Sequence, residues 1–333
     1  RKDLRAVTVA DHTILVNSTR RVKLREATDD VQPPTALVFV KRGIAACDYN
    51  VQIKVDDEVV ADVTYTSQGG DKPDTFKTNH VAQELYEKLT DALGEDWEVR
   101  VFGSSLTIRR QDGGDFSIKT TDSYGNDALK GIKGSVQRFT DLPPEAEDGM
   151  VLKVEGDADS SFDNFYVKFR DNEEGSGVWQ ETVKPGLQNE FDPSTMPHRL
   201  IRSGYNEFTL LQIEWEPRLI GDEHSAPEPS FVGETINDVF FYKNRLGVLS
   251  GENVVLSRAG DFFNFWPSTA TDVLDNDPID VAVSTTSVAI LRYAVPFVHN
   301  LILFSDQQQF SLSAGGTILA PRTVAIDPAT QFE

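Results

Sequence analysis

The stretch from Phe231 to Trp266 consists of an apolar run, a basic break, a tight hairpin and a cluster of aromatic residues. Residues 236–242 are rich in β-branched and aromatic residues, the strand pattern resumes at 246–249 after a polar break, and it returns at 254–256 after a Ser-Gly-Glu-Asn turn at 250–253. This composition suits a pleated strand, and the turn residues suit a hairpin. A dense group of aromatic residues follows and adds a large apolar surface. The pattern predicts a buried sheet element and contains no catalytic signature.

A different period appears in the first half of the chain and predicts one helix. Apolar residues recur there at helical spacing: Val81, Leu85, Leu89 and Leu93. We expect Thr78 or Asn79 to cap the start of this helix and Gly94 to end it. Strand-like segments lie on both sides of it, so a small α+β unit with the helix packed on a sheet is predicted.

The layout of strand, break and hairpin at 236–258 recurs at 288–313, and residues 4–24 echo it. A repeat of about 40–50 residues with four short strands has the size of a propeller blade. Proline pairs at 33–34 and 143–144 indicate boundaries. We therefore predict a mainly β, propeller-like body with an inserted α+β domain, divided as follows: first strands of the body, 1–26; inserted α+β domain, 27–145; short β meander, 146–190; remaining body, 191–333. On this interpretation 27–190 is inserted between blades.

Composition narrows the class of protein. The chain is 39% hydrophobic, which fits a folded protein, and no apolar run reaches the roughly 18 residues of a membrane span. Its single cysteine, Cys47, excludes an internal disulfide and has apolar neighbours that favour a core position. The net charge of −21 is the opposite of what a protein that grips phosphates usually carries.

Several long sequence segments, called words here, resemble segments of the tail tubular protein B family, the nozzle proteins of short-tailed bacteriophages, and they occur in the same order. The resemblance is strong over roughly 195–333 and over the first two dozen residues, and loose between them. The words are RKDLRAVTVADHTILVN (1–17), TMPHRLIR (195–202), PSFVG (229–233), INDVFFYKNRLGVLSGENVVLSR (236–258), FNFW (263–266), DNDPIDVAVST (275–285), ILRYAVPF (290–297) and FSDQQQFSLSA (304–314).

The resemblance implies a structural virion protein with a propeller domain. It implies a six-fold ring below the adaptor, tail tubular protein A, near the tail fibres, that conducts double-stranded DNA without specific binding during genome ejection. The protein would be assembled in the host cytoplasm and reside in the virion tail. Family members have sequence before residue 1 and after residue 333, so we expect this chain to be a piece of a longer protein. We also expect an acidic channel wall and an outward-facing insertion that contacts the adaptor or the fibres.

One cluster supports an alternative, a glycan-binding or glycan-hydrolysing tail component. Glu214 and Glu216 flank Trp215, and on a strand both carboxylates would lie on one face about 7 Å apart. That arrangement suits a glycosidase pair with an aromatic platform. The same alternation also arises on any strand with one solvated face. Reducing-end release from host polysaccharide, abolished by Glu214→Gln, would support the alternative.

Other clusters favour turns. Asp157, Asp159 and Asp163 lack the glycine and the final glutamate of a calcium loop. Three further aspartates surround a proline and suit a turn: Asp275, Asp277 and Asp280. The five histidines are isolated, and nucleophile-elbow, Walker, dinucleotide and zinc motifs are absent from the sequence. We therefore predict no catalytic, metal or cofactor site, and no enzyme.

Lys243, Arg245 and Arg258 flank the central hairpin and are the candidates for a subunit interface or for facing DNA. Arginine would act there through bidentate pairing with a carboxylate of a neighbour. A solvated face with local ion pairs is the alternative. A sequence-independent DNA-binding module is a third hypothesis for the whole chain, which the acidic charge disfavours and a salt-sensitive gel shift would support.

Overall fold

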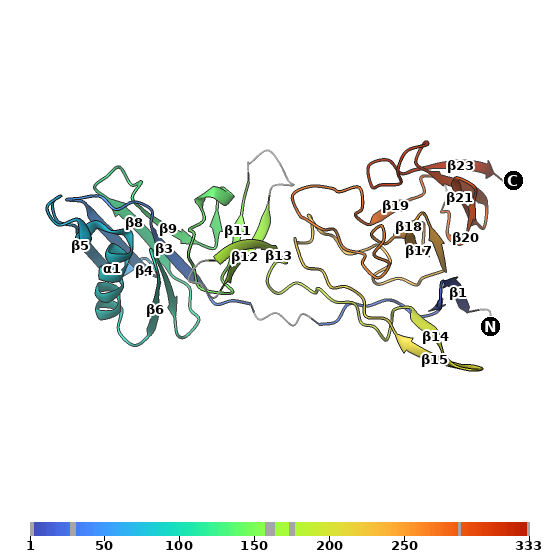
Figure 1. Ribbon diagram of the computed structural model, residues 1–333, viewed down its shortest axis with the longest axis horizontal. Coiled ribbons are helices and arrows are strands. Elements are labelled where there is room, and N and C mark those ends of the chain that lie inside the picture. Colours follow the sequence, from blue (N-terminus) through green and yellow to red (C-terminus); the bar gives the residue numbers. More distant parts are fainter. Residues whose placement is uncertain (1–2, 27–30, 157–163, 173–176, 286–287, 332–333) are drawn as a thin grey trace. The chain divides into compact units, whose positions relative to one another are not determined.

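The computed structural model describes residues 3–26, 31–156, 164–172, 177–285 and 288–331, which are mainly β-strand with one α-helix (Figure 1). The chain divides into two compact units. Residues 1–29 and 186–333 form one, called here the β body, and residues 30–185 form the other, called the inserted unit. The predicted mainly β fold with a single clear helix is confirmed.

The β body contains three four-stranded antiparallel sheets in the described part of the chain. The first consists of β1 (Leu4–Val9), β2 (His12–Asn17), β14 (His198–Gly204) and β15 (Glu207–Gln212). The middle sheet consists of β16 (Asp238–Tyr242), β17 (Arg245–Ser250), β18 (Asn253–Leu256) and β19 (Ile279–Ala282). The third consists of β20 (Leu291–Phe297), β21 (Asn300–Ser305), β22 (Gln308–Ser313) and β23 (Ala325–Gln331).

In the sequence, the inserted unit lies between two strands of the same sheet and not between two sheets. Strand β2 pairs directly with β14, with Leu15 opposite His198 and His12 opposite Ile201. The expectation of an insertion between blades is therefore wrong, because the insertion lies between the second and third strands of the first sheet. The echo of the layout over 4–24 holds only for its first two strands, since residues 21–24 form only isolated bridges. Pairing across the insertion is possible because the entropy of closing a long excursion grows only slowly with its length.

The middle sheet is buried on both faces. Strand neighbours share a face, and on one face Val239, Val248 and Val255 belong to the same apolar cluster as Ile14 and Val16 of the first sheet. On the other face Phe240 and Leu256 pack in a cluster with the third sheet, through Leu291, Leu301 and Leu303. Every residue of β17 is accordingly buried. The three sheets therefore stack in sequence order, with the predicted central hairpin in the middle.

A glycine permits a close cross-strand contact within the middle sheet. A Cβ atom built on Gly247 would lie 2.2 Å from the ring of Phe240, the cross-strand neighbour. No side chain fits at that distance, so the aromatic ring lies directly over the backbone of β17.

The inserted unit contains an eight-stranded and a three-stranded sheet. The eight-stranded sheet has the order β13-β12-β11-β10-β9-β3-β7-β6, in which β10 and β11 are parallel and the other neighbours antiparallel. Its strands are β3 (Thr35–Val40), β6 (Trp97–Phe102), β7 (Ser105–Arg110), β9 (Leu129–Lys133), β10 (Ser135–Val136), β11 (Val151–Val154), β12 (Phe165–Asp171) and β13 (Gly177–Thr182). The three-stranded sheet consists of β4 (Asp48–Val55), β5 (Glu58–Thr66) and β8 (Ser117–Asp122). The strands expected as a meander over 146–190 thus extend the larger sheet.

The helix α1 (Thr78–Leu93) follows a short 3-10 turn, η1 (Pro73–Phe76). A second 3-10 turn, η2, spans Phe139–Asp141. The predicted apolar stripe is confirmed, since Val81, Leu85 and Leu89 are fully buried. Gly94 ends the helix at positive φ, and its N–H donates to the carbonyl of Thr90. The predicted side-chain cap is wrong: Lys77 occupies the N-cap position, and its side chain makes no capping bond.

Two apolar clusters lie on opposite faces of β3. Ala36 and Val38 belong to the cluster under α1, which also includes Cys47, the buried free cysteine. Leu37 points the other way and joins a cluster with β9, β11 and β12. Strand β3 is therefore a continuous apolar run because both of its faces are covered.

Candidate functional site

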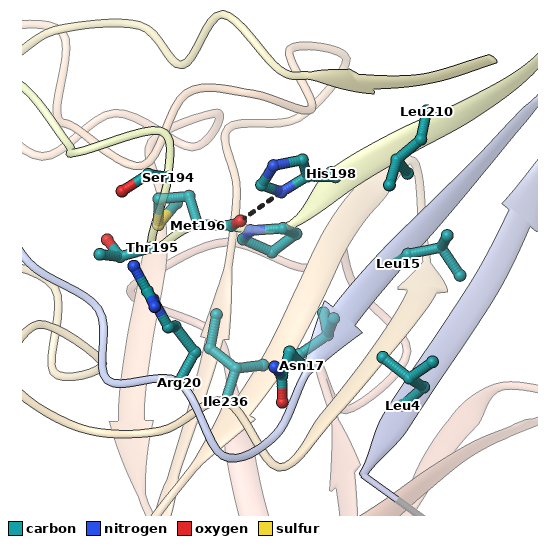
Figure 2. Close-up of a pocket in the computed structure, with 12 residues that line it drawn as sticks. Leu4, Leu15, Asn17, Arg20, Ser194, Thr195, Met196, His198, Leu210 and Ile236 are labelled. Carbon is teal, nitrogen blue, oxygen red and sulfur yellow. Dashed lines mark hydrogen bonds between the residues drawn. The ribbon is translucent and has the colours of Figure 1, made fainter. Parts of the chain in front are cut away.

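A cavity of about 370 Å³ lies at the first sheet of the β body (Figure 2). Leu15, Met196 and Ile236 contribute apolar surface to it, and Arg20 and His198 contribute polar groups. The Nδ1 atom of His198 is 3.0 Å from the carbonyl oxygen of Met196, so the backbone orients this ring. The lining holds neither a carboxylate nor a cysteine. The cavity is therefore suited to hold an apolar group beside a positive charge, and it lacks a partner for acid–base work.

The first strands of the three sheets meet inside the β body. Strand β16 contacts β1 on one side and β20 on the other. The guanidinium of Arg5 on β1 lies over the ring of Tyr293 on β20, 5.4 Å from its centre. The carboxylate of Asp238 on β16 accepts the N–H of Ala294 at 3.0 Å. Burial raises the pKa of Asp238, and the backbone bond and the charge of Arg5 only partly oppose this effect.

Arg245 is buried, with 1% of its surface exposed, and it links three segments of the β body. Its guanidinium donates to the carbonyls of Ser257 at 2.7 Å, Asp277 at 2.6 Å and Asp275 at 2.8 Å. Longer contacts reach two further carbonyls, of Asn276 and Leu319. Burial lowers its pKa, and the nearby charge of Asp277 opposes this effect. The guanidinium of Arg245 is therefore bound by carbonyls of its own chain.

The structure separates the other two basic candidates from Arg245. Lys243 lies exposed in the two-residue turn between β16 and β17, where it and Asn244 adopt positive φ as a type I′ hairpin requires. It lines an open hollow of about 600 Å³ with the loop at 317–319. Arg258 is half-buried in the loop after β18, and its N–H bonds the carbonyl of Asn264. Lys243 is therefore the most accessible of the three.

The cluster around Trp215 lies outside any strand, which corrects the geometry on which the glycan alternative depended. The backbone here bonds to another loop, with the N–H of Glu216 donating to the carbonyl of Phe263 at 3.0 Å. Pro217 has no N–H and therefore cannot continue a strand ladder. The ring of Trp215 packs against Phe263 and Phe265, at 5.5 and 5.8 Å between ring centres. Glu214 and Glu216 are exposed. The tryptophan thus serves the core and does not form an open platform.

The aspartates at 275–280 have structural contacts. Asp277 accepts the N–H and hydroxyl of Ser268 and the N–H of Leu274, and Asp280 accepts both donors of Ser230. The aspartates at 157–163 lie outside the described residues. Among the described residues, no group of three or more histidine, cysteine, aspartate and glutamate side chains could hold a metal ion.

Arg218, which no motif in the sequence singles out, is a buried cation in an aromatic cluster. Its guanidinium lies 4.4 Å from the ring centre of Trp266, which stacks on Phe191 at 5.2 Å. No described residue accepts a hydrogen bond from its guanidinium, and burial lowers its pKa. The sequence gives only an indirect sign of this contact, because Trp266, which covers Arg218, lies far from it along the chain.

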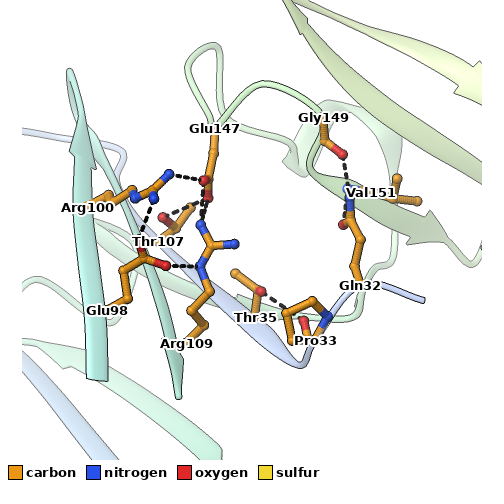
Figure 3. A network of polar contacts seen from close by, with 10 residues as sticks. All are labelled: Gln32, Pro33, Thr35, Glu98, Arg100, Thr107, Arg109, Glu147, Gly149 and Val151. Carbon is orange, nitrogen blue, oxygen red and sulfur yellow. Dashed lines mark hydrogen bonds and ion pairs between the residues drawn. The ribbon is translucent and has the colours of Figure 1, made fainter. Parts of the chain in front are cut away.

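The inserted unit carries a network of four charged side chains (Figure 3). Glu147, from the loop before β11, pairs with Arg100 at 2.7 Å and with Arg109, on β6 and β7 respectively. Glu98 pairs with the same two arginines, 2.8 Å from Arg109. Gln32 joins the same loop through Gly149 and Val151, at 2.6 and 3.1 Å. The network fastens a loop to a sheet.

The described helix is too short and too polar to cross a membrane. The described residues line the cavities and form the polar networks given above.

Comparison with known proteins defines the family. Residues 1–333 match the family described as bacteriophage nozzle protein, and the chain belongs to it. It is a structural component of the phage tail. The chain is 38% identical, over 343 aligned positions, to the tail tubular protein gp12 of Escherichia phage T7. The match covers the whole of this chain and 42% of that relative, so the chain spans less than half the relative's length.

Proposed function

We propose that this chain forms part of the wall of the tail nozzle, the conduit through which the genome leaves the virion. The observation that carries the proposal is the family match along the whole chain. Virions made without the protein should lack the nozzle in electron cryomicroscopy images and should fail to release DNA, and the full-length gene supplied in trans should restore both. Normal DNA release from virions without the protein would contradict the proposal.

The three stacked sheets are, in this proposal, consecutive blades of a propeller that the rest of the protein completes. The middle sheet is covered on both faces, whereas the outer two each keep an open face with apolar residues. On the third sheet Tyr293, Val295 and Phe297 point to one side and are 52, 48 and 64% exposed. On the first sheet Leu4 and Leu210 are exposed on the face opposite Ile14. A structure of the full-length protein should place further sheets on both faces; solvent on both would contradict the propeller.

Six copies would form a ring around an acidic passage. The net charge of −21 motivates the acidic wall, because like charge repels phosphates and avoids the counterion release that makes DNA bind tightly. DNA would then slide without being held. A ring structure whose channel wall is predominantly basic would contradict this part of the proposal. In that ring Lys243 and Arg258 are the candidates for contact with a neighbour or with DNA.

The inserted unit would face outward and bind the adaptor, tail tubular protein A, or the tail fibres. Its chain enters and leaves between paired strands, so the sheet of the β body does not depend on its content. Deleting residues 30–185 from the full-length protein should leave the β body folded and abolish docking to the tail. Loss of folding, or normal docking, would contradict this assignment.

A further inference from the structure

The hairpin of β14 and β15 extends beyond the sheet to which it belongs. Strand β2 supports β14 only as far as Ile201, opposite His12, in the described register. Pairing between β14 and β15 continues through Arg202, opposite Phe208, to the turn at Tyr205 and Asn206. Residues 202–208, called here the projecting ribbon, are therefore two strands without a third (Figure 1). Such ribbons are marginally stable in water unless something packs on them.

Local contacts fix the shape of the ribbon. Asn206 adopts positive φ in the turn, and the register shifts at Gly204. The Nε atom of Arg202 donates to the carbonyl of Gly204 at 3.0 Å, and the hydroxyl of Thr209 donates to that of Ser203 at 3.0 Å. These contacts favour one conformation of the ribbon and so reduce the ordering that a partner must impose on it.

The side chains of the ribbon resemble those of an interface. Tyr205 is 86% exposed at the tip, and Phe208 is 63% exposed on the adjoining strand. Exposed Arg202 lies directly opposite Phe208. Tyrosine, phenylalanine and arginine are the residues that interface cores favour, and aromatic residues carry much of the binding energy.

Charge identifies the partner. The hairpin carries Arg199 and Arg202 against one acid, Glu207, within a chain of net charge −21. Between Arg202 and Lys243 the only arginine or lysine is Arg218, which is buried, whereas Glu214, Glu216 and Glu228 are exposed. A second copy of this chain, with its net charge of −21 and these exposed glutamates, would therefore offer acidic side chains that complement the ribbon. Two different patches that complement each other generate a ring when the rotation closes.

We propose that the projecting ribbon binds the acidic surface of a second copy of this chain and forms a contact between neighbouring subunits. The inference rests on the ring in the proposed function and assigns a surface to it. The aromatic side chains would supply the buried apolar area, and Arg202 would supply the orientation.

The test is assembly of the full-length protein, followed by mass photometry across a concentration series. The double substitution Tyr205→Ser and Phe208→Ser should raise the concentration for half-assembly at least tenfold, and Arg202→Glu should also weaken assembly. Tyr124→Ser, at a half-exposed tyrosine of the inserted unit, is the matched control and should assemble like the wild type. Thermal unfolding establishes that each variant is folded. If the double variant does not fold, the single Tyr205→Ser variant at the tip decides.

A photo-crosslinking residue at position 205 gives a second readout. The expected product joins two copies, with the second attachment site near exposed glutamates. A ring that forms unchanged in the ribbon variants would overturn the inference and leave the proposed ring intact. A wild-type protein that never assembles would overturn both. A crosslink formed only with DNA or with another tail protein would overturn the inference alone.

Discussion

The two units of this chain solve the problem of covering a sheet in different ways. The inserted unit covers both faces of β3 with its own helix, smaller sheet and loops. The β body covers both faces only of its middle sheet, and the outer sheets keep apolar residues on an open side. In the inserted unit the exposed large apolar residues do not recur at alternate positions of one strand, since Val59 and Val60 are adjacent on β5, whereas on β20 they do. One unit encloses its own apolar clusters, and the other leaves apolar residues exposed on its outer sheets.

The largest test of this comparison separates the two units. Residues 30–185 expressed alone should be monomeric and unfold cooperatively, because their cores are closed. Residues 1–29 joined to 186–333 should bind a hydrophobic dye and aggregate, because two apolar faces stay open. Calorimetry and dye fluorescence measure the difference. A dye-free, monomeric β body, or an inserted unit without a thermal transition, would break the comparison.

Substitution of Arg245 tests how the β body is held together internally. Arg245→Met should reduce the free energy of unfolding of that unit by about 3–5 kcal/mol, because it leaves several buried carbonyls without a donor. Lys243→Met, two positions away in the exposed turn, should change it by less than about 0.5 kcal/mol. Urea unfolding of both variants is the measurement. Equal stabilities would mean that Arg245 does not stabilise the body.

The corresponding test in the inserted unit concerns its ion network. Glu147→Gln should cost about 1–3 kcal/mol, because Glu147 is mostly buried and pairs with two arginines. Glu58→Gln, at an exposed position that starts β5, is the control and should cost almost nothing. A double-mutant cycle with Arg109→Gln isolates the pair. If the losses in the free energy of unfolding are additive, the pairing of Glu147 with Arg109 does not stabilise the inserted unit.

The smallest effect is a pH dependence within the β body. Burial raises the pKa of Asp238 above its ordinary value of 3.8, so just above that pH the folded protein keeps a proton that the unfolded chain releases. Stability therefore falls as pH rises through the window above 3.8, and the penalty is complete once the folded carboxyl has ionised. Asp238→Asn should raise the stability at pH 7 by up to about 1 kcal/mol and give no gain below pH 3.8. Urea unfolding from acid to neutral pH measures it, and a gain that persists in acid would exclude this cause.

Local sequence patterns predicted which segments form strands and helices better than they predicted which strands pair with each other. The hairpin at 236–258 and the apolar stripe of α1 follow from period and turn chemistry, and both are present. Nothing local indicated that β2 pairs with β14, because the two strands are separated by the whole insertion. For the same reason, the strands at 151–182 could be predicted as strands but not as part of the larger sheet.

The candidate residues show a similar limit. Lys243 is exposed, as its charge suggests, but the neighbouring Arg245 is buried, although arginine is rarely so. The difference depends on carbonyls of residues 257, 275 and 277, which converge only in the folded chain. Alternation around Trp215 also looked like a strand, yet a proline and an aromatic cluster hold it as a loop. Side-chain type therefore indicates chemistry, whereas burial depends on contacts distant in sequence.

The place where the insertion leaves the β body has a mechanical consequence. The outgoing and returning segments lie side by side, since Leu24 bridges Phe191 and Arg25 pairs with Glu190 at 2.6 Å. A pull on the inserted unit is thus shared by two segments that an isolated bridge and an ion pair already join. Because β2 pairs with β14 through residues that all lie outside the insertion, the content of the insertion contributes no pairing residue to that ladder.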